Sequence, residues 1–415
     1  MSRAQRALTP IPEAVRENFH WLAAPHLKSI TDALEAAQKD AARFVGGCVR
    51  DSLIGQTPKD FDIATVLQPS EVKTAMEAAN IRVVDTGIDH GTVTAISDHQ
   101  GVEITTLRAD VSTDGRRATV AFTTDWTTDA CRRDFRLNAI YLTPGGMLFD
   151  PAGGVEDAFA RTVRFIGDPH QRLREDYLRI LRFFRFSARF CDRFDPEGLA
   201  ACEAERDGLG QLSAERIGAE IMAILALPRA AAAIEAMAQS GVLGAVWAAE
   251  PDLKTLRALK EIDPDAAAPV ALAAVFGAAG DGLGARLRLS NAEDALRLNA
   301  LAAAQKVSPD LDDGAIRALI YRLGADVFLD GVLLQSATGA LTPDKAREYR
   351  EIADTWAPPR FGVSGGQLVK AGVAPGPDIS VLLRRIEEQW ISEGFPPPSR
   401  LEEILSTCVA AYGRR

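Results

Sequence analysis

The stretch FVGGCVRDSLIGQTPKDFDIAT, residues 44–65, carries the pattern that decides the fold of this chain. Phe44-Val45 is typical of the end of a short strand or helix, and Gly46-Gly47 lets the backbone approach a ligand closely. A helix is expected to begin near Cys48, and a phosphate fits against the free amides of such a helix start. Arg50 lies one turn further along, where its guanidinium can pair with the same phosphate.

Two aspartates follow in an extended segment, Asp60-Phe61-Asp62. Side chains alternate in direction along such a segment, so both carboxylates face one space while Phe61 faces the core. Asp51, next to Arg50, can hold that arginine or a ribose. Two carboxylates on one face repel each other unless they bind a cation, and Mg²⁺ takes oxygen ligands of this kind together with phosphate oxygens. The stretch therefore predicts a metal-dependent nucleotide site with Mg²⁺ on Asp60 and Asp62.

A third carboxylate is expected for phosphoryl transfer with two metal ions, where one ion activates the attacking hydroxyl and the other steadies the leaving group. Glu103 is the best candidate, because it lies in mid-strand between Val102 and Ile104. It therefore projects opposite to its apolar neighbours, toward the aspartate pair. The alternative is an exposed strand glutamate without a catalytic role.

The composition narrows the class of protein. The chain has 415 residues, 47% hydrophobic and 25% charged, enough for about two to four domains. We expect a cytoplasmic globular protein, because no apolar run approaches the roughly 20 residues of a membrane span and the N-terminal residues lack an apolar signal core. The five cysteines are scattered, which indicates neither disulfides nor a zinc site. The net charge of -10 argues against a uniformly basic coat but allows a local basic track.

The hydrophobic pattern changes along the chain. Up to about residue 150, five segments alternate or run apolar and are expected to form one sheet: 82–84, 92–96, 102–107, 118–122 and 139–142. Helices are expected at 30–39 and 69–79. From Pro169 onward helical spacing dominates, including the Ala-rich residues 229–238. Breaks are expected at five places: 192–196, 263–264, 308–309, 358–359 and 396–398.

Residues 175–179, EDYLR, place an acid and an arginine where they could bind the edge of a base. Asp176 and Arg179 are three residues apart on an expected helix, where they form an acceptor beside a donor. Cytosine and adenine both present an amine donor beside a ring-nitrogen acceptor, which fits this pair, whereas uracil and guanine present the reverse order. The alternative is an Asp176–Arg179 ion pair within the helix, worth only ~0.3 to 0.5 kcal/mol.

The same helix carries a basic track. At ~100° per residue, four arginines fall within one arc and are expected to line a cleft for a triphosphate and an RNA end: Arg179, Arg182, Arg185 and Arg189. Four further arginines either add to the positive potential or form a solvated face: Arg161, Arg164, Arg172 and Arg174.

Jointly, these motifs resemble the class II tRNA nucleotidyltransferases, the CCA-adding enzymes, and the related bacterial poly(A) polymerases. The resemblance also rests on three later motifs: RRDFRLNA at 132–139, DPAGG at 150–154 and EDYLRILRFFRF at 175–186. It continues less sharply through LSAERIGAEI at 212–221. A tail segment, GGQLVKAGVAPGP at 365–377, is similar less sharply, and its glycines precede helices in a way that suits phosphate binding or close helix packing. Each motif is weak alone, whereas the set is specific.

The resemblance implies an α+β fold with a mixed-sheet nucleotidyltransferase head followed by an all-helical neck, body and tail. The expected boundaries are 1–155 for the head, 156–228 for the neck, 229–345 for the body and 346–415 for the tail. The implied activity is template-independent addition of C, C and A to the tRNA 3' end from CTP and ATP, with Mg²⁺ as cofactor and pyrophosphate as product. Neither a membrane nor an obligate protein partner is expected.

The resemblance also assigns the site. The expected catalytic residues are Asp60, Asp62 and Glu103. The expected nucleotide-binding residues are Gly46, Gly47, Arg50, Asp51, Arg132, Arg133, Asp134, Asn138, Asp176, Arg179, Arg182 and Arg185. Among these, residues 132–138 are implied to surround the ribose and triphosphate. The family usually has threonine where this chain has Arg136, which is expected to touch RNA or phosphate instead. The turn at 113–117 is expected to be a mobile loop over the site or an ordinary hairpin tip.

Four alternatives stay open. A bacterial-type poly(A) polymerase is the nearest, although the short basic segment that marks those enzymes after the neck is not recognisable in this sequence. A CC-only or A-only adding enzyme would share every motif. A catalytically silent RNA-binding protein is disfavoured by the intact Asp60-x-Asp62 pair. A nucleotidyltransferase for small molecules would have no use for the long helical C-terminal half. An appended HD phosphohydrolase domain is not expected, because the sequence has no HD dipeptide.

Overall fold

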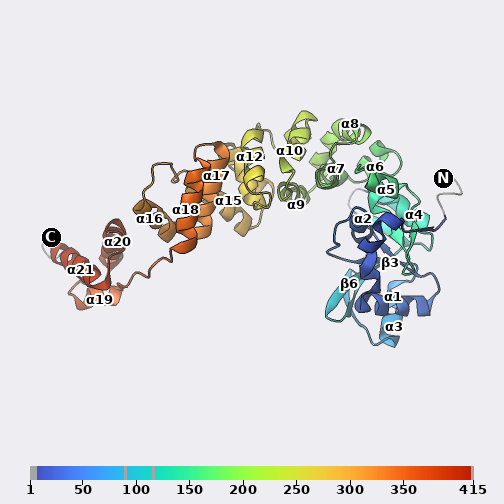
Figure 1. Ribbon diagram of the computed structural model, residues 1–415, viewed down its shortest axis with the longest axis horizontal. Coiled ribbons are helices and arrows are strands. Elements are labelled where there is room, and N and C mark those ends of the chain that lie inside the picture. The colour runs from blue at the N-terminus through green and yellow to red at the C-terminus, as the bar shows by residue number, and fades with distance from the viewer. Residues whose placement is uncertain (1–6, 88–90, 115–116, 413–415) are drawn as a thin grey trace. The chain divides into compact units, whose positions relative to one another are not determined.

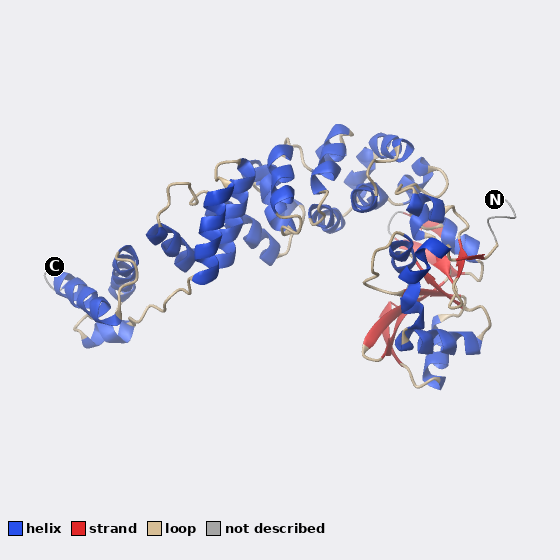
Figure 2. Ribbon diagram, viewed as in Figure 1, coloured by secondary structure: helices blue, strands red, loops and turns tan. Residues whose placement is uncertain are grey.

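The computed structural model describes residues 7–87, 91–114 and 117–412 (Figure 1). The chain divides into two compact units, one of residues 1–224 with 232–248 and the other of residues 225–231 with 249–415. Strands occur in the N-terminal unit, and the described chain after Phe149 is helical apart from its connections (Figure 2). The expected fold class, a mixed-sheet head followed by helices, is confirmed. The four-part division into head, neck, body and tail stays a prediction.

The main sheet has eight strands in the order β1-β10-β9-β2-β3-β6-β5-β4. Their bounds are β1 Thr9–Pro10, β2 Ala42–Val45, β3 Asp62–Thr65, β4 Arg82–Gly87, β5 Thr92–Ser97, β6 Gln100–Thr106, β9 Tyr141–Leu142 and β10 Met147–Phe149. All neighbouring strands are antiparallel except β3 and β6, whose parallel pairing sets Asp62 beside Glu103. Buried Val102 and Ile104 alternate with exposed Glu103 on β6, as the period of two predicted.

The prediction of a single sheet is wrong for residues 118–122. β7 (Arg108–Asp114) and β8 (Arg117–Phe122) pair only with each other among the described residues. The backbone amide of Leu107 still donates to the Thr65 carbonyl, next to the main sheet. The Leu107 carbonyl accepts instead from the Thr123 amide, which follows β8, so the chain leaves the main sheet at this point. Alternation predicts a strand but does not choose its partner. Of the predicted turn at 113–117, residues 115 and 116 lie outside the described residues.

A second strand prediction is too long. Residues 139–142 were expected to be extended, but only Tyr141–Leu142 form β9, and the 3-10 helix η4 (Arg136–Asn138) precedes them. The amide of Ala139 donates to the Arg136 carbonyl, which closes this helical turn. The short helix places Asn138 at the end of the central strands.

Helices of the N-terminal unit cover the sheet and continue beyond it. Those of the first 160 residues are η2 Glu13–Ala23, α1 Pro25–Ala37, α2 Gly47–Leu53, α3 Pro69–Ala78, α4 Trp126–Cys131 and α5 Gly154–Phe159. The next are α6 Pro169–Glu175, α7 Leu178–Phe190, α8 Pro196–Ala204, η5 Arg206–Gln211, α9 Ala214–Leu225, α10 Ala230–Gln239 and α11 Val242–Val246. The expected helices at 30–39 and 69–79 are α1 and α3, and α3 is capped by Gln68 and Glu71.

The core of the head lies between the sheet and these helices. Leu27, Ile30 and Leu34 of α1 and Met76 of α3 are buried with sheet residues such as Ile104. A smaller apolar cluster around Val45, Leu107 and Tyr141 lies directly behind the ends of the central strands. The two clusters hold the strand ends, where the polar motifs lie, in fixed positions.

The C-terminal unit is helical. Its elements are α12 Leu253–Ile262, α13 Ala268–Phe276, η6 Gly277–Gly280, α14 Leu283–Arg286, α15 Asn291–Ala304, α16 Asp313–Leu323, α17 Ala325–Thr338, α18 Pro343–Thr355, α19 Gly365–Lys370, α20 Pro377–Ser392 and α21 Pro398–Tyr412. Of the five expected breaks, those at 263–264, 308–309 and 358–359 fall between helices, whereas those at 192–196 and 396–398 end on the first residue of a helix, Pro196 of α8 and Pro398 of α21. Two buried clusters stabilise it, one around Ile320, Phe328 and Tyr349 and one around Ile386 and Trp390.

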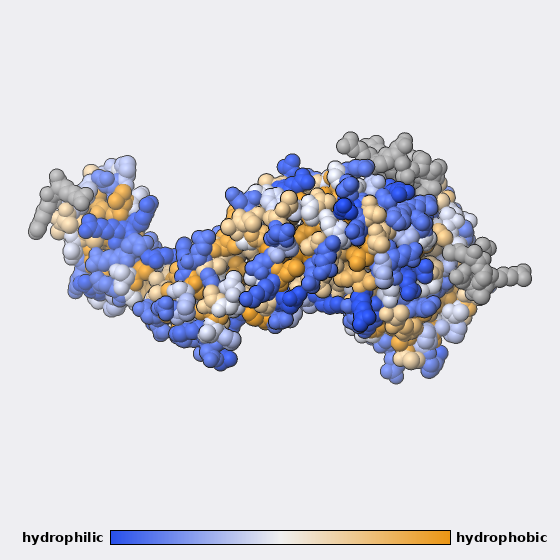
Figure 3. Space-filling model, turned by 90° about the horizontal axis from the view of Figure 1, so that it is seen from above, coloured by the Kyte–Doolittle hydropathy of each residue, from blue (hydrophilic) through white to orange (hydrophobic). Residues whose placement is uncertain are grey.

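The surface and the cysteines agree with the composition. No helix within the described residues is long and apolar enough to cross a membrane. On the face seen in Figure 3, apolar residues lie in short bands between polar ones. The five cysteines are free thiols, and burial raises the pKa of Cys48 to about 12.

Candidate active site

The glycine pair forms the turn that the sequence predicts. Strand β2 ends at Val45, Gly46 adopts a φ of 74°, and α2 begins at Gly47. A side chain at Gly46 would be strained in this left-handed conformation, which explains the glycine. Both glycines line an open cavity of about 640 Å³, so unhindered backbone faces the space where a ligand would bind.

The aspartate pair lines the same cavity. Asp60 and Asp62 are exposed and line the cavity, whereas Phe61 packs on Trp21 with ring centroids 5.0 Å apart. The expected alternation is therefore confirmed. Neither carboxylate forms a hydrogen bond or ion pair with another described residue, although the guanidinium of Arg133 is close enough to act on Asp62 electrostatically.

Glu103 lies beside this pair through the parallel register of β3 and β6. The pKa of Asp62 is raised, first because its carboxylate is partly withdrawn from water, then because Glu103 and Asp60 add negative charge, while Arg133 opposes the shift. Within residues 7–87, 91–114 and 117–412 no three Asp, Glu, His or Cys side chains form a ready-made metal cage. Two exposed carboxylates nevertheless fit Mg²⁺, which commonly binds one or two carboxylates together with substrate phosphates.

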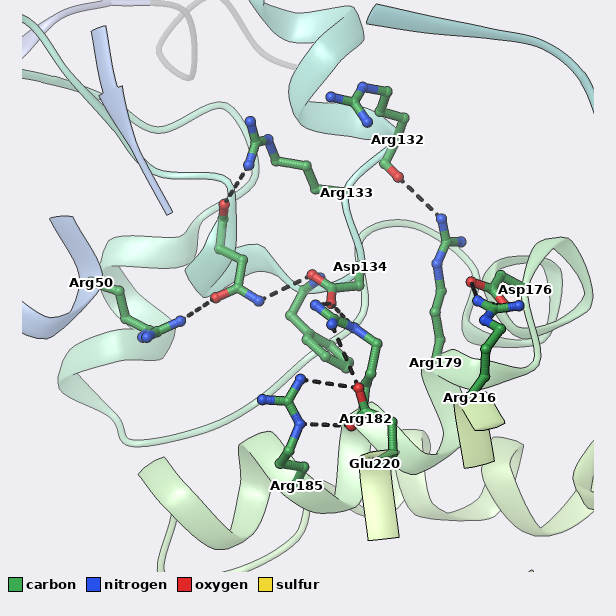
Figure 4. A network of polar contacts seen from close by, with 12 residues as sticks. Arg50, Arg132, Arg133, Asp134, Asp176, Arg179, Arg182, Arg185, Arg216 and Glu220 are labelled. Carbon is green, nitrogen blue, oxygen red and sulfur yellow. Dashed lines mark hydrogen bonds and ion pairs between the residues drawn. The ribbon is translucent and has the colours of Figure 1, made fainter. Parts of the chain in front are cut away.

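A buried polar chain supports the arginine next to the glycine turn. Asp51 binds Arg50 at 2.7 and 2.8 Å, which is one of the two roles predicted for it. Arg50 Nη1 donates to Asn138 Oδ1 at 2.6 Å, and Asn138 Nδ2 donates to Asp134 at 3.0 Å (Figure 4). Arg182 then donates twice to Asp134, at 2.9 and 2.6 Å. Each of these side chains except Asp51 lines the cavity.

The basic track on α7 exists, and each of its arginines has an acidic partner. Arg179 pairs with Glu175 at 2.7 Å, Arg182 with Asp134 at 2.6 Å, Arg185 with Glu220 at 2.6 Å and Arg189 with Asp51 at 3.2 Å. The first three line the cavity. Of the four further arginines, three also pair with acids: Arg164 with Asp157, Arg172 with Glu175 and Arg174 with Glu205.

The placement of Asp176 on a helix is wrong. Helix α6 ends at Glu175 and α7 begins at Leu178, while Asp176 has extended backbone, and its side chain accepts from the Leu178 amide at 3.1 Å. An aspartate that bonds a nearby backbone amide in this way competes with helix formation. Asp176 still lines the cavity together with Arg179.

The alternative Asp176–Arg179 ion pair is also wrong. Arg216 of α9 donates to both oxygens of Asp176, at 3.0 and 2.8 Å (Figure 4). Arg179 is held instead by Glu175 and by the carbonyls of Arg172 and Arg132, at 2.8 and 3.1 Å. The proposed acceptor and donor are therefore fixed separately, each by its own partners.

The cavity unites the motifs from distant parts of the sequence. Its lining is Gly46, Gly47, Arg50, Asp60, Asp62, Arg132, Arg133, Asp134, Asn138, Asp176, Arg179, Arg182, Arg185 and Phe186. Of the expected site residues, Asp51 and Glu103 lie outside this lining. Arg136 also lies outside it, and its Nε donates to the Phe165 carbonyl at 3.3 Å; the contact of Arg136 with RNA or phosphate stays a prediction.

Sequence reasoning missed several residues that hold the others. Phe186 lines the cavity, with the guanidinium of Arg185 4.7 Å and that of Arg182 5.2 Å from its ring centre. Its position four residues after Arg182 on one helix was the available signal. Arg216 and Glu220 belong to the segment LSAERIGAEI. Their partners, Asp176 and Arg185, are distant in sequence, so no local pattern could have predicted these contacts.

Two protein-family models match the chain. Residues 42–164 match the poly(A) polymerase head domain, and residues 193–254 match a probable RNA- and SrmB-binding site of polymerase A. The first match contains the glycine turn, the aspartates and the arginine motif. The second contains helices α8 to α11.

Curated relatives and a solved structure agree over most of the chain. Human CCA tRNA nucleotidyltransferase 1, mitochondrial, is 35% identical over 398 residues, which cover 94% of this chain and 91% of that protein. The CCA-adding enzyme of Levilactobacillus brevis is 29% identical, with 92% and 96% covered. The crystal structure of the Bacillus stearothermophilus CCA-adding enzyme with CTP matches with a TM-score of 0.72 and 25% identity, covering 89% and 93%. The chain therefore belongs to the family of class II CCA-adding tRNA nucleotidyltransferases and bacterial poly(A) polymerases.

Proposed function

We propose that this protein adds C, C and A in turn to the 3' end of tRNA, using CTP and ATP without a nucleic-acid template and releasing pyrophosphate. The observation that carries the proposal is the single cavity that joins the glycine turn, two aspartates, the 132–138 motif and the arginines of α7. The human and Levilactobacillus relatives are named for this activity, and the Bacillus enzyme was solved with CTP.

The reaction joins the terminal ribose hydroxyl of the RNA to the α-phosphate of the nucleotide, and pyrophosphate leaves. In the proposed arrangement, the arginines that line the cavity bind the triphosphate, because guanidinium groups match phosphate oxygens. The backbone amide of Gly47, the first residue of α2, adds a neutral donor. Asn138 and Asp134 hold Arg50 and Arg182 in place, so the positive groups are fixed before the nucleotide arrives.

Nucleotidyltransferases of this family generally need divalent metal ions. We propose Mg²⁺ as the ion and Asp60 and Asp62 as the residues that hold it, with Glu103 beside them. The ion, when bound, supplies positive charge that stabilises the charge developing on the phosphoryl group. The assignment is supported by Asp62, whose carboxylate is close to the negative charges of Glu103 and Asp60.

Base selection is proposed to rest on Asp176 and Arg179. The carboxylate accepts the amine of cytosine or adenine, and the guanidinium donates to the adjacent ring nitrogen. A carboxylate oxygen has two lone pairs, so Asp176 can accept from a base while it remains bonded to Arg216. Uracil and guanine would instead place a carbonyl oxygen against the Asp176 carboxylate and an N–H group against the Arg179 guanidinium. Each buried hydrogen bond that is lost in this way costs roughly 1 to 3 kcal/mol.

The test uses tRNA that ends at the discriminator base. The protein is incubated with CTP, ATP, GTP or UTP separately, with CTP and ATP together, and with EDTA before Mg²⁺ is restored, and the products are sequenced. We expect C-C ends with CTP alone, C-C-A ends with both nucleotides, and no extension until Mg²⁺ returns. Long A tracts would instead support poly(A) polymerase activity, which the names of the two family models favour. An absence of extension with every nucleotide would overturn the proposal.

A further inference from the structure

A buried carboxylate that the sequence motifs do not single out lies behind the cavity. Asp129, on α4, is 1% exposed and does not line the cavity. Six hydrogen bonds from described residues converge on it, three on each oxygen. A fully buried carboxylate of this kind is stable only when charged or polar donors surround it.

The two oxygens are divided between the two arginines of the cavity. Oδ1 accepts from Arg132 Nε and Nη2 at 2.8 and 2.6 Å, and Oδ2 accepts from Arg133 Nε and Nη2 at 3.2 and 3.1 Å. The spacing of three and four residues brings both guanidinium groups to the same carboxylate at the end of α4. Each arginine therefore binds side-on through two nitrogens, which fixes its plane as well as its position.

The remaining donors fix Asp129 itself. The Tyr141 hydroxyl donates to Oδ2 at 2.7 Å, and the Arg108 amide, the first of β7, donates to Oδ1 at 3.0 Å. Tyr141 is fully buried, and Trp126 packs edge-on against it at 5.6 Å. The carboxylate is thus held by the central strand β9, by its own helix and by the start of the β7–β8 hairpin.

The charge state agrees with this geometry. Burial alone would raise the pKa of Asp129, but Arg133, Arg132, the Tyr141 hydroxyl and the Arg108 amide outweigh it and hold the pKa at about 2. Asp129 is therefore ionised at every pH at which the protein would act. Without its negative charge, two neighbouring guanidinium groups would repel each other inside a cavity that already holds several arginines.

We infer that Asp129 is a positioning residue that directs Arg132 and Arg133 toward the triphosphate of the incoming nucleotide. The inference rests on the proposed function, in which these arginines meet phosphate. Asp129 touches neither substrate nor metal in this account. Its role is to hold two long side chains in one orientation, so that nucleotide binding does not have to order them.

Asp129→Asn tests the inference. The variant keeps the shape but removes the charge, and its amide nitrogen would face guanidinium donors. We expect the dissociation constant for inorganic tripolyphosphate, and KM for CTP and for ATP, to rise about 10- to 100-fold, as expected for the loss of charged hydrogen bonds. Asp125→Asn is the matched control: it removes a carboxylate from the same helix, keeps a good N-cap and should change none of these constants.

Tripolyphosphate binding separates this inference from the proposed function, because it requires neither RNA nor turnover. A wild-type protein that extends no tRNA but binds tripolyphosphate more tightly than Asp129→Asn would overturn the function and keep the inference. An Asp129→Asn protein that extends tRNA with wild-type KM values and tripolyphosphate affinity, and differs only in Tm, would overturn the inference. Should that variant not fold, Tyr141→Phe, which removes one bond to Oδ2, decides: a several-fold weaker tripolyphosphate affinity supports the positioning role, and an unchanged affinity contradicts it.

Discussion

At the scale of single residues, the cavity follows one pattern: each arginine that lines it is paired with an acid. The pairs are Arg50 with Asp51, Arg132 and Arg133 with Asp129, Arg179 with Glu175, Arg182 with Asp134, and Arg185 with Glu220. The acids fix the guanidinium groups and remove part of their mutual repulsion. A chain with a net charge of -10 can therefore present a basic cavity without a basic surface elsewhere.

Base selection gives the first residue-scale prediction. In Asp176→Ala the acceptor for the amine of cytosine and adenine is lost, and with it the group that rejects uracil and guanine. We expect catalytic efficiency with CTP and ATP to fall about one to two decades, because a charged hydrogen bond worth roughly 1.5 to 3 kcal/mol is removed. The ratios of kcat/KM for CTP over UTP and for ATP over GTP should fall toward one.

Asp168→Asn is a suitable control for that measurement, because Asp168 caps α6 through the Gln171 amide and does not line the cavity. Asparagine caps a helix about as well as aspartate, so both ratios should stay at their wild-type values. If Asp176→Ala slows all four nucleotides equally while its Tm is normal, Asp176 only anchors Arg216 and does not read the base.

At the scale of elements, the DPAGG motif joins a helix to the site. The Asp150 carboxylate accepts from the amides of Gly154 and Val155, at 2.8 and 2.9 Å, and so caps α5. A methyl group at Gly154 would lie 2.1 Å from the backbone oxygen of Arg136, in the short helix η4 that also carries Asn138. The glycine therefore permits close packing of α5 on the element that positions Arg50.

Gly154→Ala should be destabilising and should also reduce activity. Backbone must move to admit the methyl group, which typically costs about 1 to 3 kcal/mol of unfolding free energy. A shift of η4 would disturb Asn138, so kcat/KM for CTP should fall as well. Gly244→Ala provides the comparison, because nothing lies within 4 Å of the added methyl and alanine favours the helix α11. Equal denaturation midpoints for the two variants would contradict the close-packing explanation.

The elements also separate what the sequence predicts from what it leaves open. Local signals placed the turn at Gly46-Gly47, the alternation around Phe61 and the breaks at the prolines, because each depends on residues near in sequence. Which strands pair with each other could not be predicted in this way, because nothing in the sequence of residues 118–122 indicates that β8 lies outside the main sheet. The partner of Asp176 was missed for a similar reason, since the bond of its carboxylate to Arg216 spans 40 residues.

At the scale of the whole molecule, the candidate site lies in the N-terminal unit alone, since all its lining residues fall within 46–186. The sequence motifs lead to most of this lining, because the motif residues meet at strand ends and on one helix face; their roles stay a prediction. The acids that hold them, such as Asp129 and Glu220, were not predicted, because their role depends on burial and on contacts between elements. The C-terminal unit has no such motif set, and its assignment to tRNA binding rests on the resemblance at 365–377.

The tail gives the last prediction. Residues 365–377 connect the starts of α19 and α20, and apart from Leu368 and Val373, which are buried in the tail core, most of them are exposed. A short exposed helix and the loop after it open readily, so their amide hydrogens exchange quickly unless a ligand covers them. If the tail binds a part of tRNA remote from its 3' end, full-length tRNA should slow exchange at 365–377, measured by mass spectrometry of peptides.

A minihelix with the same acceptor end, at equal occupancy, should slow exchange around the cavity but not in the tail. CTP with Mg²⁺ should likewise slow exchange only in the N-terminal unit, because a ligand stabilises the part of the protein that binds it. Equal slowing of residues 365–377 by both RNAs, or none by full-length tRNA, would exclude a tail contact with the distant part of the substrate and favour helix packing as the reason for the glycines.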